Sequence, residues 1–337
     1  MSPGRLPTSN PHSPRTALNP QIDQQQIASG MASAFDINSL FRVDGMVAVI
    51  TGGGTGIGLT MARALATNGA QRVYILGRRL NVLQAAAAAT PGLVPLQCDV
   101  TSKDSLQAAV DRITAETGHI NLLVANSGVG GPPNRWDPNL SVRDLRHALF
   151  TSVAPSAFTA ALDVNVTSAF FTITAFLELL NAGNGRAVDG ESGSFGGPGL
   201  GSVGGGDVQA VQSQVVITSS MAAFSRVSLS PPAYAVSKAA VVQITKQASS
   251  MLAKHGIRVN ALAPGLFPSD LAAGMIGDRK PELEPYGDPK FIPARRFGGD
   301  EEMAGTILYL ASRAGSYCNG LVLLIDGGRS AVMSSSY

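Results

Sequence analysis

Short apolar runs alternate along this chain with longer segments in which apolar residues recur every three or four positions. Runs of about four to eight apolar residues are typical of strands buried on both faces of a parallel sheet, and the longer segments have the period of an amphipathic helix. The alternation predicts an α/β fold, with one doubly wound Rossmann-type domain built on a parallel sheet of about seven strands. We predict strands near residues 46–50, 72–76, 93–98, 122–125, 215–218, 259–262 and 322–325, and helices at 59–66, 81–89, 102–116, 156–180, 233–254 and 300–311.

A glycine-rich turn separates the first predicted strand from the first predicted helix. Residues 51–58 read Thr-Gly-Gly-Gly-Thr-Gly-Ile-Gly. In this context glycines let the backbone approach a pyrophosphate, and the N–H groups at the helix N-terminus bind it. The other interpretation is a flexible loop, since the chain has 38 glycines. We predict a dinucleotide site whose contacts in this turn are Thr51, Gly52, Thr55, Gly56, Ile57 and Gly58.

Tyr234 and Lys238 stand four residues apart in the predicted helix at 233–254. Side chains with this spacing lie on the same helix face. A cation beside a phenol favours the phenolate and lowers the tyrosine pKa from its usual value of about 10. Tyr234 is therefore a candidate general acid and base.

The glycine turn and the Tyr-x-x-x-Lys pair together resemble the short-chain dehydrogenase/reductase family, and the resemblance extends over residues 41–328. Further matches follow in the family's order. Two residues depart from its pattern: Ser127 replaces the usual alanine and Ser269 the usual threonine. The other matching positions are Asp99-Val100, Asn126-Ser127-Gly128, Asn165, the strand that ends at Ser220, Pro264-Gly265, and the last strand with the glycines at 327–328.

The resemblance implies an oxidoreductase that interconverts a ketone and a secondary alcohol by hydride transfer with a nicotinamide cofactor. Tyr234 would exchange a proton with the substrate oxygen, and Lys238 would also bind the nicotinamide ribose. Ser220 would hydrogen-bond the developing alkoxide, and Asn165 would hold a water that links Lys238 to solvent. The implied cofactor contacts outside the turn are Asp99, Val100, Asn126, Ser127, Gly128, Tyr234, Lys238, Pro264, Gly265, Phe267 and Ser269.

Two other classes of function remain open at this point. One is a scaffold or regulator that binds the cofactor without catalysis, and the other is a lyase or isomerase that uses the fold without net hydride transfer. A Tyr234 variant that keeps full activity would contradict the mechanism implied above.

The position of the serine has a second interpretation. The spacing from Ser220 to Tyr234 is one residue longer than the family's, and a strict count back reaches Met221, which cannot donate a hydrogen bond to an alkoxide. An insertion in the loop at 224–232 keeps Ser220 in place, and Ser219 is the fallback. A serine pair after a strand also caps turns.

The choice between NAD and NADP depends on the end of the second predicted strand. An NAD enzyme of this kind places a carboxylate there for the ribose 2′-hydroxyl. This chain has Gly77 at that position, followed by Arg78 and Arg79. A guanidinium suits a 2′-phosphate because it is planar and always charged. We predict NADP(H) with Arg78 as a contact; a solvated basic turn is the alternative.

Several segments lie outside the regular alternation. We predict a disordered tail at 1–40, where Met31 is an alternative start, a domain at 41–330 and a C-terminal tail at 331–337. An insertion at 129–155 is either a substrate wall or a surface excursion, and the glycine-rich segment 182–214 is predicted to be a flexible loop. The stretch 265–296 is a candidate substrate lid. Its apolar residues Leu266, Phe267, Leu271 and Met275 either favour an apolar substrate or pack in the core.

Composition narrows the classes of partner. Charged residues make up 14% of the chain and the net charge is +2 without a basic run, which does not favour nucleic acid. No stretch has the roughly 20 apolar residues that span a bilayer. Two cysteines, Cys98 and Cys318, form neither a disulfide framework nor a metal site and favour a reducing, cytoplasmic compartment. The resemblance further implies a homodimer or homotetramer that pairs through the helices at 156–180 and 233–254.

Overall fold

The computed structural model describes residues 36–188, 195–196 and 211–333. Within these residues, seven parallel strands form one sheet in the spatial order β3-β2-β1-β4-β5-β6-β7, which confirms the predicted doubly wound sheet. The strand order reverses at β1, and ligands bind beside such a reversal in open α/β sheets. The strands are β1 Val47–Thr51, β2 Arg72–Gly77, β3 Leu93–Gln97, β4 Leu122–Ala125, β5 Gln214–Thr218, β6 Arg258–Pro264 and β7 Val322–Ile325.

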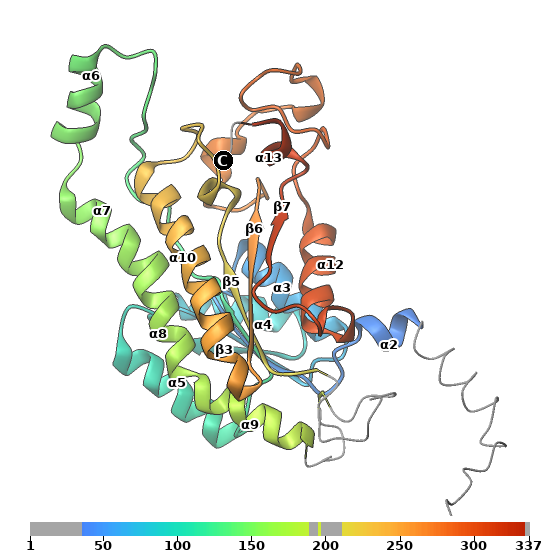
Figure 1. The fold of residues 1–337 in the computed structure, drawn as a ribbon. Coiled ribbons are helices and arrows are strands. Elements are labelled where there is room, and N and C mark those ends of the chain that lie inside the picture. Colours follow the sequence, from blue (N-terminus) through green and yellow to red (C-terminus); the bar gives the residue numbers. More distant parts are fainter. Residues whose placement is uncertain (1–35, 189–194, 197–210, 334–337) are drawn as a thin grey trace, which may run out of the picture.

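Helices cover both faces of the sheet (Figure 1). The longer ones are α3 Gly56–Thr67, α4 Leu80–Ala89, α5 Lys103–Glu116, α7 Pro155–Leu162, α8 Ser168–Ala175, α9 Leu177–Val188, α10 Pro232–Met251 and α12 Asp300–Ala311. Among the described residues, the short helices are α2 Ile37–Phe41, α6 Val142–Arg146, α11 Ala273–Ile276 and α13 Arg329–Val332.

Each strand supplies side chains to two cores because successive residues point to opposite faces. In β1, Ala48 and Ile50 join the core beneath α3, α4 and α12, whereas Val47 and Val49 join the core beneath α5, α8 and α10. This burial on both faces is why the strands appear in the sequence as continuous apolar runs.

The helix predicted at 156–180 is longer than expected and is interrupted. A π-helical turn, Asp163–Thr167, joins α7 to α8, and α9 continues to Val188. The predicted flexible segment at 182–214 therefore begins too early, because its first residues are helical. The rest of that segment lies largely outside the described residues, although Phe195 and Val211 are buried in the core.

Tertiary contacts hold the glycine-containing end of α9 in place. Asn184 donates to the Gly256 carbonyl at 2.8 Å and accepts from the Ser213 amide at 2.8 Å. Gly183 is buried, and a Cβ there would overlap the Ile120 carbonyl oxygen. These contacts tie α9 to the segments that enter β4, β5 and β6, so the helix persists where its sequence alone favours a loop.

The insertion at 129–155 mostly leaves the body of the domain. Figure 1 shows α6 standing apart at the end of α7, and Trp136 is 60% exposed. By length and composition alone, Pro155–Ala175 is apolar enough to cross a membrane. Of its most apolar window 33% is buried, and Ala169 and Ile173 pack in the core beneath α5, α8 and α10.

The ends of the domain differ by a few residues from the prediction. At the N-terminal end, α2 begins at Ile37, and the Asp36 carboxylate caps it by accepting from the Ser39 amide at 3.0 Å. The rest of the predicted tail, 1–35, lies outside the described residues. At the other end, α13 continues past residue 330 to Val332.

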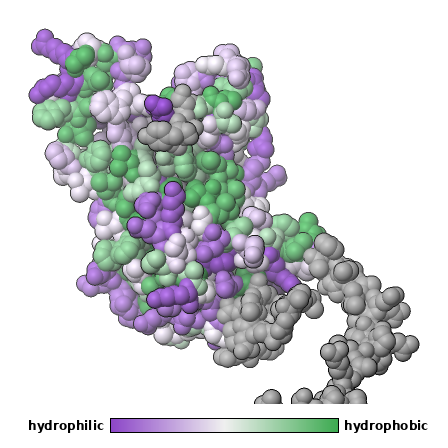
Figure 2. Space-filling model, in the orientation of Figure 1, coloured by the Kyte–Doolittle hydropathy of each residue, from purple (hydrophilic) through white to green (hydrophobic). Residues whose placement is uncertain are grey.

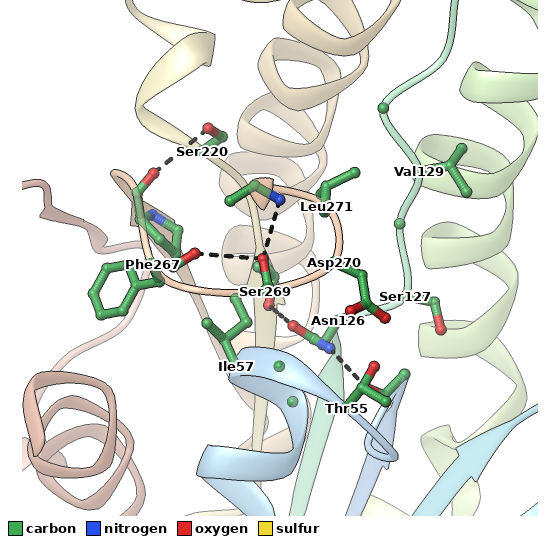
Figure 3. Close-up of a pocket in the computed structure, with 18 of the residues that line it drawn as sticks. Thr55, Ile57, Asn126, Ser127, Val129, Ser220, Phe267, Ser269, Asp270 and Leu271 are labelled. Atoms are coloured by element: carbon green, nitrogen blue, oxygen red, sulfur yellow. Dashed lines mark hydrogen bonds between the residues drawn. The ribbon is translucent and has the colours of Figure 1, made fainter. Parts of the chain in front are cut away.

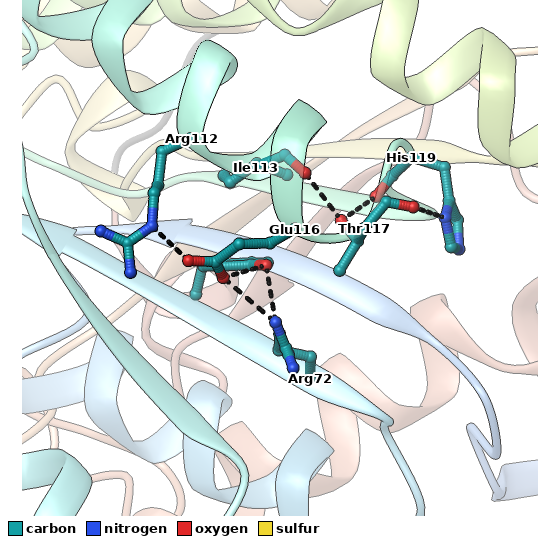
Figure 4. A network of polar contacts seen from close by, with 7 residues as sticks. Arg72, Arg112, Ile113, Glu116, Thr117 and His119 are labelled. Atoms are coloured by element: carbon teal, nitrogen blue, oxygen red, sulfur yellow. Dashed lines mark hydrogen bonds and ion pairs between the residues drawn. The ribbon is translucent and has the colours of Figure 1, made fainter.

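A polar network closes the domain away from the glycine turn, where β2 begins (Figure 4). Glu116, the last residue of α5, accepts from the Tyr74 hydroxyl at 2.8 Å and pairs with Arg72 at 3.1 Å. Arg112 contacts the other carboxylate oxygen. Arg72 is the first residue of β2, so these contacts hold α5 against the sheet at the end opposite the carboxyl ends of the strands.

Candidate active site

A cavity of about 580 Å³ opens at the carboxyl ends of the strands, within the range of small-molecule sites. It brings together nearly all of the predicted site residues, several of which are drawn in Figure 3. Thr51 and Asn165 do not line the cavity but support residues that do. The predicted residues that line it are Gly52, Thr55, Gly56, Ile57, Gly58, Arg78, Asp99, Val100, Asn126, Ser127, Gly128, Ser220, Tyr234, Lys238, Pro264, Gly265, Phe267 and Ser269.

The glycine turn has the geometry that a dinucleotide cradle requires. Gly52 and Gly56 have φ values of 64° and 53°, which side-chain-bearing residues rarely adopt. A Cβ at Gly58 would overlap the Gly52 carbonyl oxygen. Gly56 is the first residue of α3. The N–H groups of the first turn of α3, which have no partner within the helix, therefore lie where the glycine turn meets the cavity. The residues present therefore fit a pyrophosphate.

Thr51 and Asn126 fasten the ends of three strands to this turn. The Thr51 hydroxyl accepts from the amides of Asn126 and Ser127 at 3.0 and 3.1 Å. The Asn126 side chain donates to the carbonyls of Thr51 and Gly52 at 3.1 and 3.3 Å and accepts from the Thr218 hydroxyl at 3.1 Å. One amide side chain thus fixes the ends of β1, β4 and β5 relative to one another.

Tyr234 and Lys238 lie on one face of α10, as their spacing predicts. Lys238 Nζ is 5.6 Å from the centre of the Tyr234 ring. The Lys238 side chain is buried, and its ammonium donates to the Thr218 carbonyl at 2.8 Å. The carboxyl end of β5 therefore sets the position of the cation.

The expected lowering of the Tyr234 pKa by Lys238 does not occur in this structure. Burial raises the pKa of Tyr234, and the Ser220 side chain opposes the rise. Burial also lowers the pKa of Lys238 to about 8, so the lysine itself is weakened as a cation. The hydrogen bond with Ser220 is the contact that favours the Tyr234 phenolate here.

The two serines at the end of β5 have different contacts. The Ser219 hydroxyl donates to the Lys238 carbonyl at 2.8 Å and is buried against α10. The Ser220 hydroxyl faces the cavity with Tyr234, accepts from the Ala222 amide at 3.2 Å and bonds the Pro264 carbonyl at 3.5 Å. Ser220 therefore caps the turn that follows β5, and its hydroxyl also lies beside the Tyr234 phenol.

Asn165 lies behind the cavity wall, on the π-helical turn. Its oxygen accepts from the Val129 amide at 2.8 Å, and its nitrogen donates to the Val129 carbonyl at 2.9 Å and the Ser237 hydroxyl at 2.8 Å. A Cβ at Gly128 would lie 3.2 Å from the Asn165 oxygen and 3.3 Å from Lys238 Nζ, so both atoms border the same glycine. Asn165 thus fixes the backbone beside the lysine.

The far end of the cavity carries two exposed guanidinium groups. Arg78 and Arg79 follow β2 and line the cavity, and the Gly77 position carries no carboxylate. Near Arg78, Asp99 accepts from the Thr101 amide at 3.0 Å and hydroxyl at 2.8 Å. These bonds and the charge of Arg78 hold the pKa of Asp99 below its usual range.

Apolar side chains from the lid segment cover the catalytic end. Leu266, Phe267, Leu271 and Met275 line the cavity, which is the first of the two predicted alternatives, and Phe267 also packs in the core, which is the second. Val129 and Gly130 line the cavity, whereas the other residues of the insertion at 129–155 do not. The insertion is therefore mainly a surface excursion. Sequence reasoning missed several lining residues, among them Met221, Leu229, Asp270, Arg329 and Met333.

Known proteins match both the chain and its fold. The family model for short chain dehydrogenases matches residues 46–196, and that for enoyl-(acyl carrier protein) reductases matches 206–330. The short-chain dehydrogenase/reductase SAT3 of Stachybotrys chartarum is 57% identical over 82% of this chain and 100% of its own length. The chain belongs to the short-chain dehydrogenase/reductase family.

Two solved structures that resemble this chain contain a nicotinamide cofactor. A complex of Pseudomonas aeruginosa RhlG with NADP is 26% identical with a TM-score of 0.67, covering 87% of this chain and 99% of that one. A 7α-hydroxysteroid dehydrogenase complex with NADH is also 26% identical with a TM-score of 0.67, covering 87% and 97%. This short-chain dehydrogenase/reductase therefore has hydride-transfer chemistry with a nicotinamide cofactor.

The buried lysine predicts a pH dependence of stability. Because the pKa of Lys238 is about 8 when folded and 10.5 when exposed, the unfolded state binds more protons between these values. The lysine's contribution to the unfolding free energy should thus rise with pH across this window, by on the order of 1–3 kcal/mol. Urea denaturation of wild type and Lys238→Met from pH 7 to 10 checks this. Parallel curves for the two proteins would contradict it.

Proposed function

We propose that this enzyme is an NADP(H)-dependent oxidoreductase that interconverts a ketone and a secondary alcohol. The observation that carries the proposal is the single cavity that joins Ser220, Tyr234 and Lys238 at one end to the glycine turn and two arginines at the other. When bound, the cofactor supplies or accepts the hydride at the substrate carbon. The protein has to orient the carbonyl and move one proton.

Each catalytic residue has a role that its contacts support. Tyr234 gives a proton to the carbonyl oxygen in reduction and takes it back in oxidation. Ser220 donates to the same oxygen as negative charge develops there. Lys238 holds a positive charge beside the phenol, and Asn165 keeps the Val129 backbone in place behind it. The Tyr234 phenol is protonated near neutral pH, as a proton donor must be, and burial, which raises its pKa, makes it a weaker acid until the cofactor and substrate are bound.

Cofactor selection follows from the charges after β2. In Arg78→Ala, the Kd for NADPH should rise by about tenfold or more, since hydrogen bonds to a phosphate contribute about 1.5–3 kcal/mol. The Kd for NADH should stay unchanged, because NADH has no 2′-phosphate for the guanidinium to bind. Calorimetric titration with both cofactors measures the two effects, with NADH as the internal control. An equal loss for the two cofactors would reject this assignment of Arg78.

The first test of the function is a side-by-side titration of the wild type with NADPH and NADH. Preference for NADPH supports the proposal and leads to a ketone screen followed by NADPH absorbance. Preference for NADH would reject the arginine argument and leave the enzyme class intact. Binding of neither would favour a misassembled site or a scaffold that has lost the cofactor as well as catalysis. Turnover of a substrate without any change in NADPH would favour a lyase or isomerase.

Three further properties belong to the same proposal. The lid residues favour a substrate with an apolar body. Phe170 on α8 and Val236 on α10 are 50% and 52% exposed, and Figure 2 shows apolar side chains on the face formed by these helices, which supports pairing into a homodimer or homotetramer. The two cysteines are free thiols, with Cys98 buried, which suits a reducing compartment such as the cytoplasm.

A further inference from the structure

Arg329 lines the cavity and follows the last strand, β7. It is the first residue of α13, which follows β7 beneath the segment 265–296 (Figure 1). It is 5% exposed and lines the same cavity as Tyr234 and Ser220. A buried guanidinium ordinarily has its charge paired and its N–H groups bonded.

The described residues leave most of this guanidinium unused. Its Nη2 donates to the Pro289 carbonyl at a long 3.3 Å, and its Nε is buried without a hydrogen-bond partner. A guanidinium has five N–H donors. Within the described chain no carboxylate lies within ion-pair distance of Arg329. Most N–H donors of the Arg329 guanidinium therefore have no hydrogen-bond partner among the described residues.

Three carboxylates lie near Arg329, and each accepts hydrogen bonds from other groups; Asp288 accepts from the Lys290 amide at 2.7 Å. Asp326 accepts from the amides of Gly328 at 3.0 Å and Ser330 at 2.7 Å, which caps α13. Glu284 pairs with Arg279 at 2.8 and 3.0 Å. Arg279 adds a second positive charge near Arg329. Both signs of charge thus surround this part of the cavity, which Asp270 also lines, and the Arg329 guanidinium is the group that keeps N–H donors without a partner.

The position in the sheet separates Arg329 from the cofactor's phosphates. The glycine turn follows β1 and Arg78 follows β2, whereas Arg329 follows β7, at the opposite edge of the sheet. Tyr234 and Ser220 lie between these ends, because Ser220 follows β5. A ligand group that reaches Arg329 therefore belongs to the substrate and not to the adenosine half of the cofactor.

We propose that Arg329 is a specificity residue that binds a carboxylate carried on an otherwise apolar carbonyl substrate. The proposal rests on the function proposed above and names its substrate class. A carboxylate matches the planar fork of a guanidinium and can bond two of its donors at once. Leu271 and Met275 of the lid then contact the apolar body of the same substrate.

The test compares aryl keto acids with their amides, which have nearly the same shape and no charge. The NADP⁺-saturated enzyme is titrated calorimetrically with 4-oxo-4-phenylbutanoate, its five- and six-carbon homologues, and the three amides; NADP⁺ prevents reduction during the titration. At least one acid should bind about tenfold or more tightly than its amide. Arg329→Met should remove this preference, and Arg329→Lys should retain part of it, which shows that the variant site is still folded.

A matched control is Arg226→Met, because Arg226 is exposed on a loop beside the cavity but does not line it. This variant should keep the acid preference in full. The proposal is overturned if no acid in the series is preferred over its amide, or if the preference survives in Arg329→Met. If NADP⁺ does not bind, the NADP(H) part of the proposed function fails, and the same comparison on the NAD⁺-bound or cofactor-free protein still decides the role of Arg329.

Discussion

Replacing Tyr234 with phenylalanine should lower turnover by about 10²–10⁴-fold, because the substrate oxygen loses its proton donor. The ring remains, so the packing of α10 and the contact with Lys238 should be preserved. NADPH affinity should therefore stay close to the wild-type value. Initial rates at saturating NADPH, together with calorimetric titration of the same preparation, separate the two effects.

A matched control is Tyr317→Phe, which removes a fully exposed phenol far from the cavity lining. This variant should keep the wild-type rate. Wild-type turnover in Tyr234→Phe would mean that the proton comes from another group, with the Ser220 hydroxyl the next one to examine. A parallel loss of turnover and NADPH binding would instead indicate a damaged site.

Two alanine substitutions in α9 should have opposite effects on stability. Gly183→Ala should lower the unfolding free energy by about 1–3 kcal/mol, because its Cβ would overlap the Ile120 carbonyl and press on the Ser213 hydroxyl. Gly185→Ala should raise it by up to about 1 kcal/mol, because Gly185 is exposed in a helix and its Cβ would meet nothing within 4 Å. Urea denaturation followed by circular dichroism measures both.

The pair forms its own control, since the two glycines stand two residues apart and carry the same change. Equal destabilisation by both substitutions would contradict a helix at this position and would restore the predicted flexible loop. Activity should be unchanged in Gly185→Ala, because the end of α9 does not reach the cavity.

Sequence reasoning succeeded where local pattern and tertiary structure agree. The strands were predictable because both of their faces are buried, which leaves unbroken apolar runs. The glycine turn was predictable because its backbone conformation restricts the residue type, as Gly52 and Gly56 show. The Tyr234–Lys238 pair was predictable because helix geometry fixes which positions share a face.

Other features depend on contacts that the sequence does not display. The end of α9 was predicted as a loop because glycine disfavours helix, whereas Asn184 and the buried Gly183 hold it by contacts with distant segments. Arg329 belongs to no motif, and only the fold carries it into the cavity. The predicted direction of the Tyr234 pKa shift was wrong because burial, which the spacing cannot show, outweighs the opposing hydrogen bond with Ser220.

The π-helical turn at Asp163–Thr167 has a consequence for how this enzyme can diverge. A π turn holds one extra residue, which offsets the side chains before it from those after it by about 100° around the helix axis. The side chains of α7, which directly follows the insertion at 129–155, are therefore rotated by this angle relative to those of α8. Substitutions can therefore remodel the outer half of this long helix while Asn165, on the turn itself, keeps its hold on the Val129 backbone.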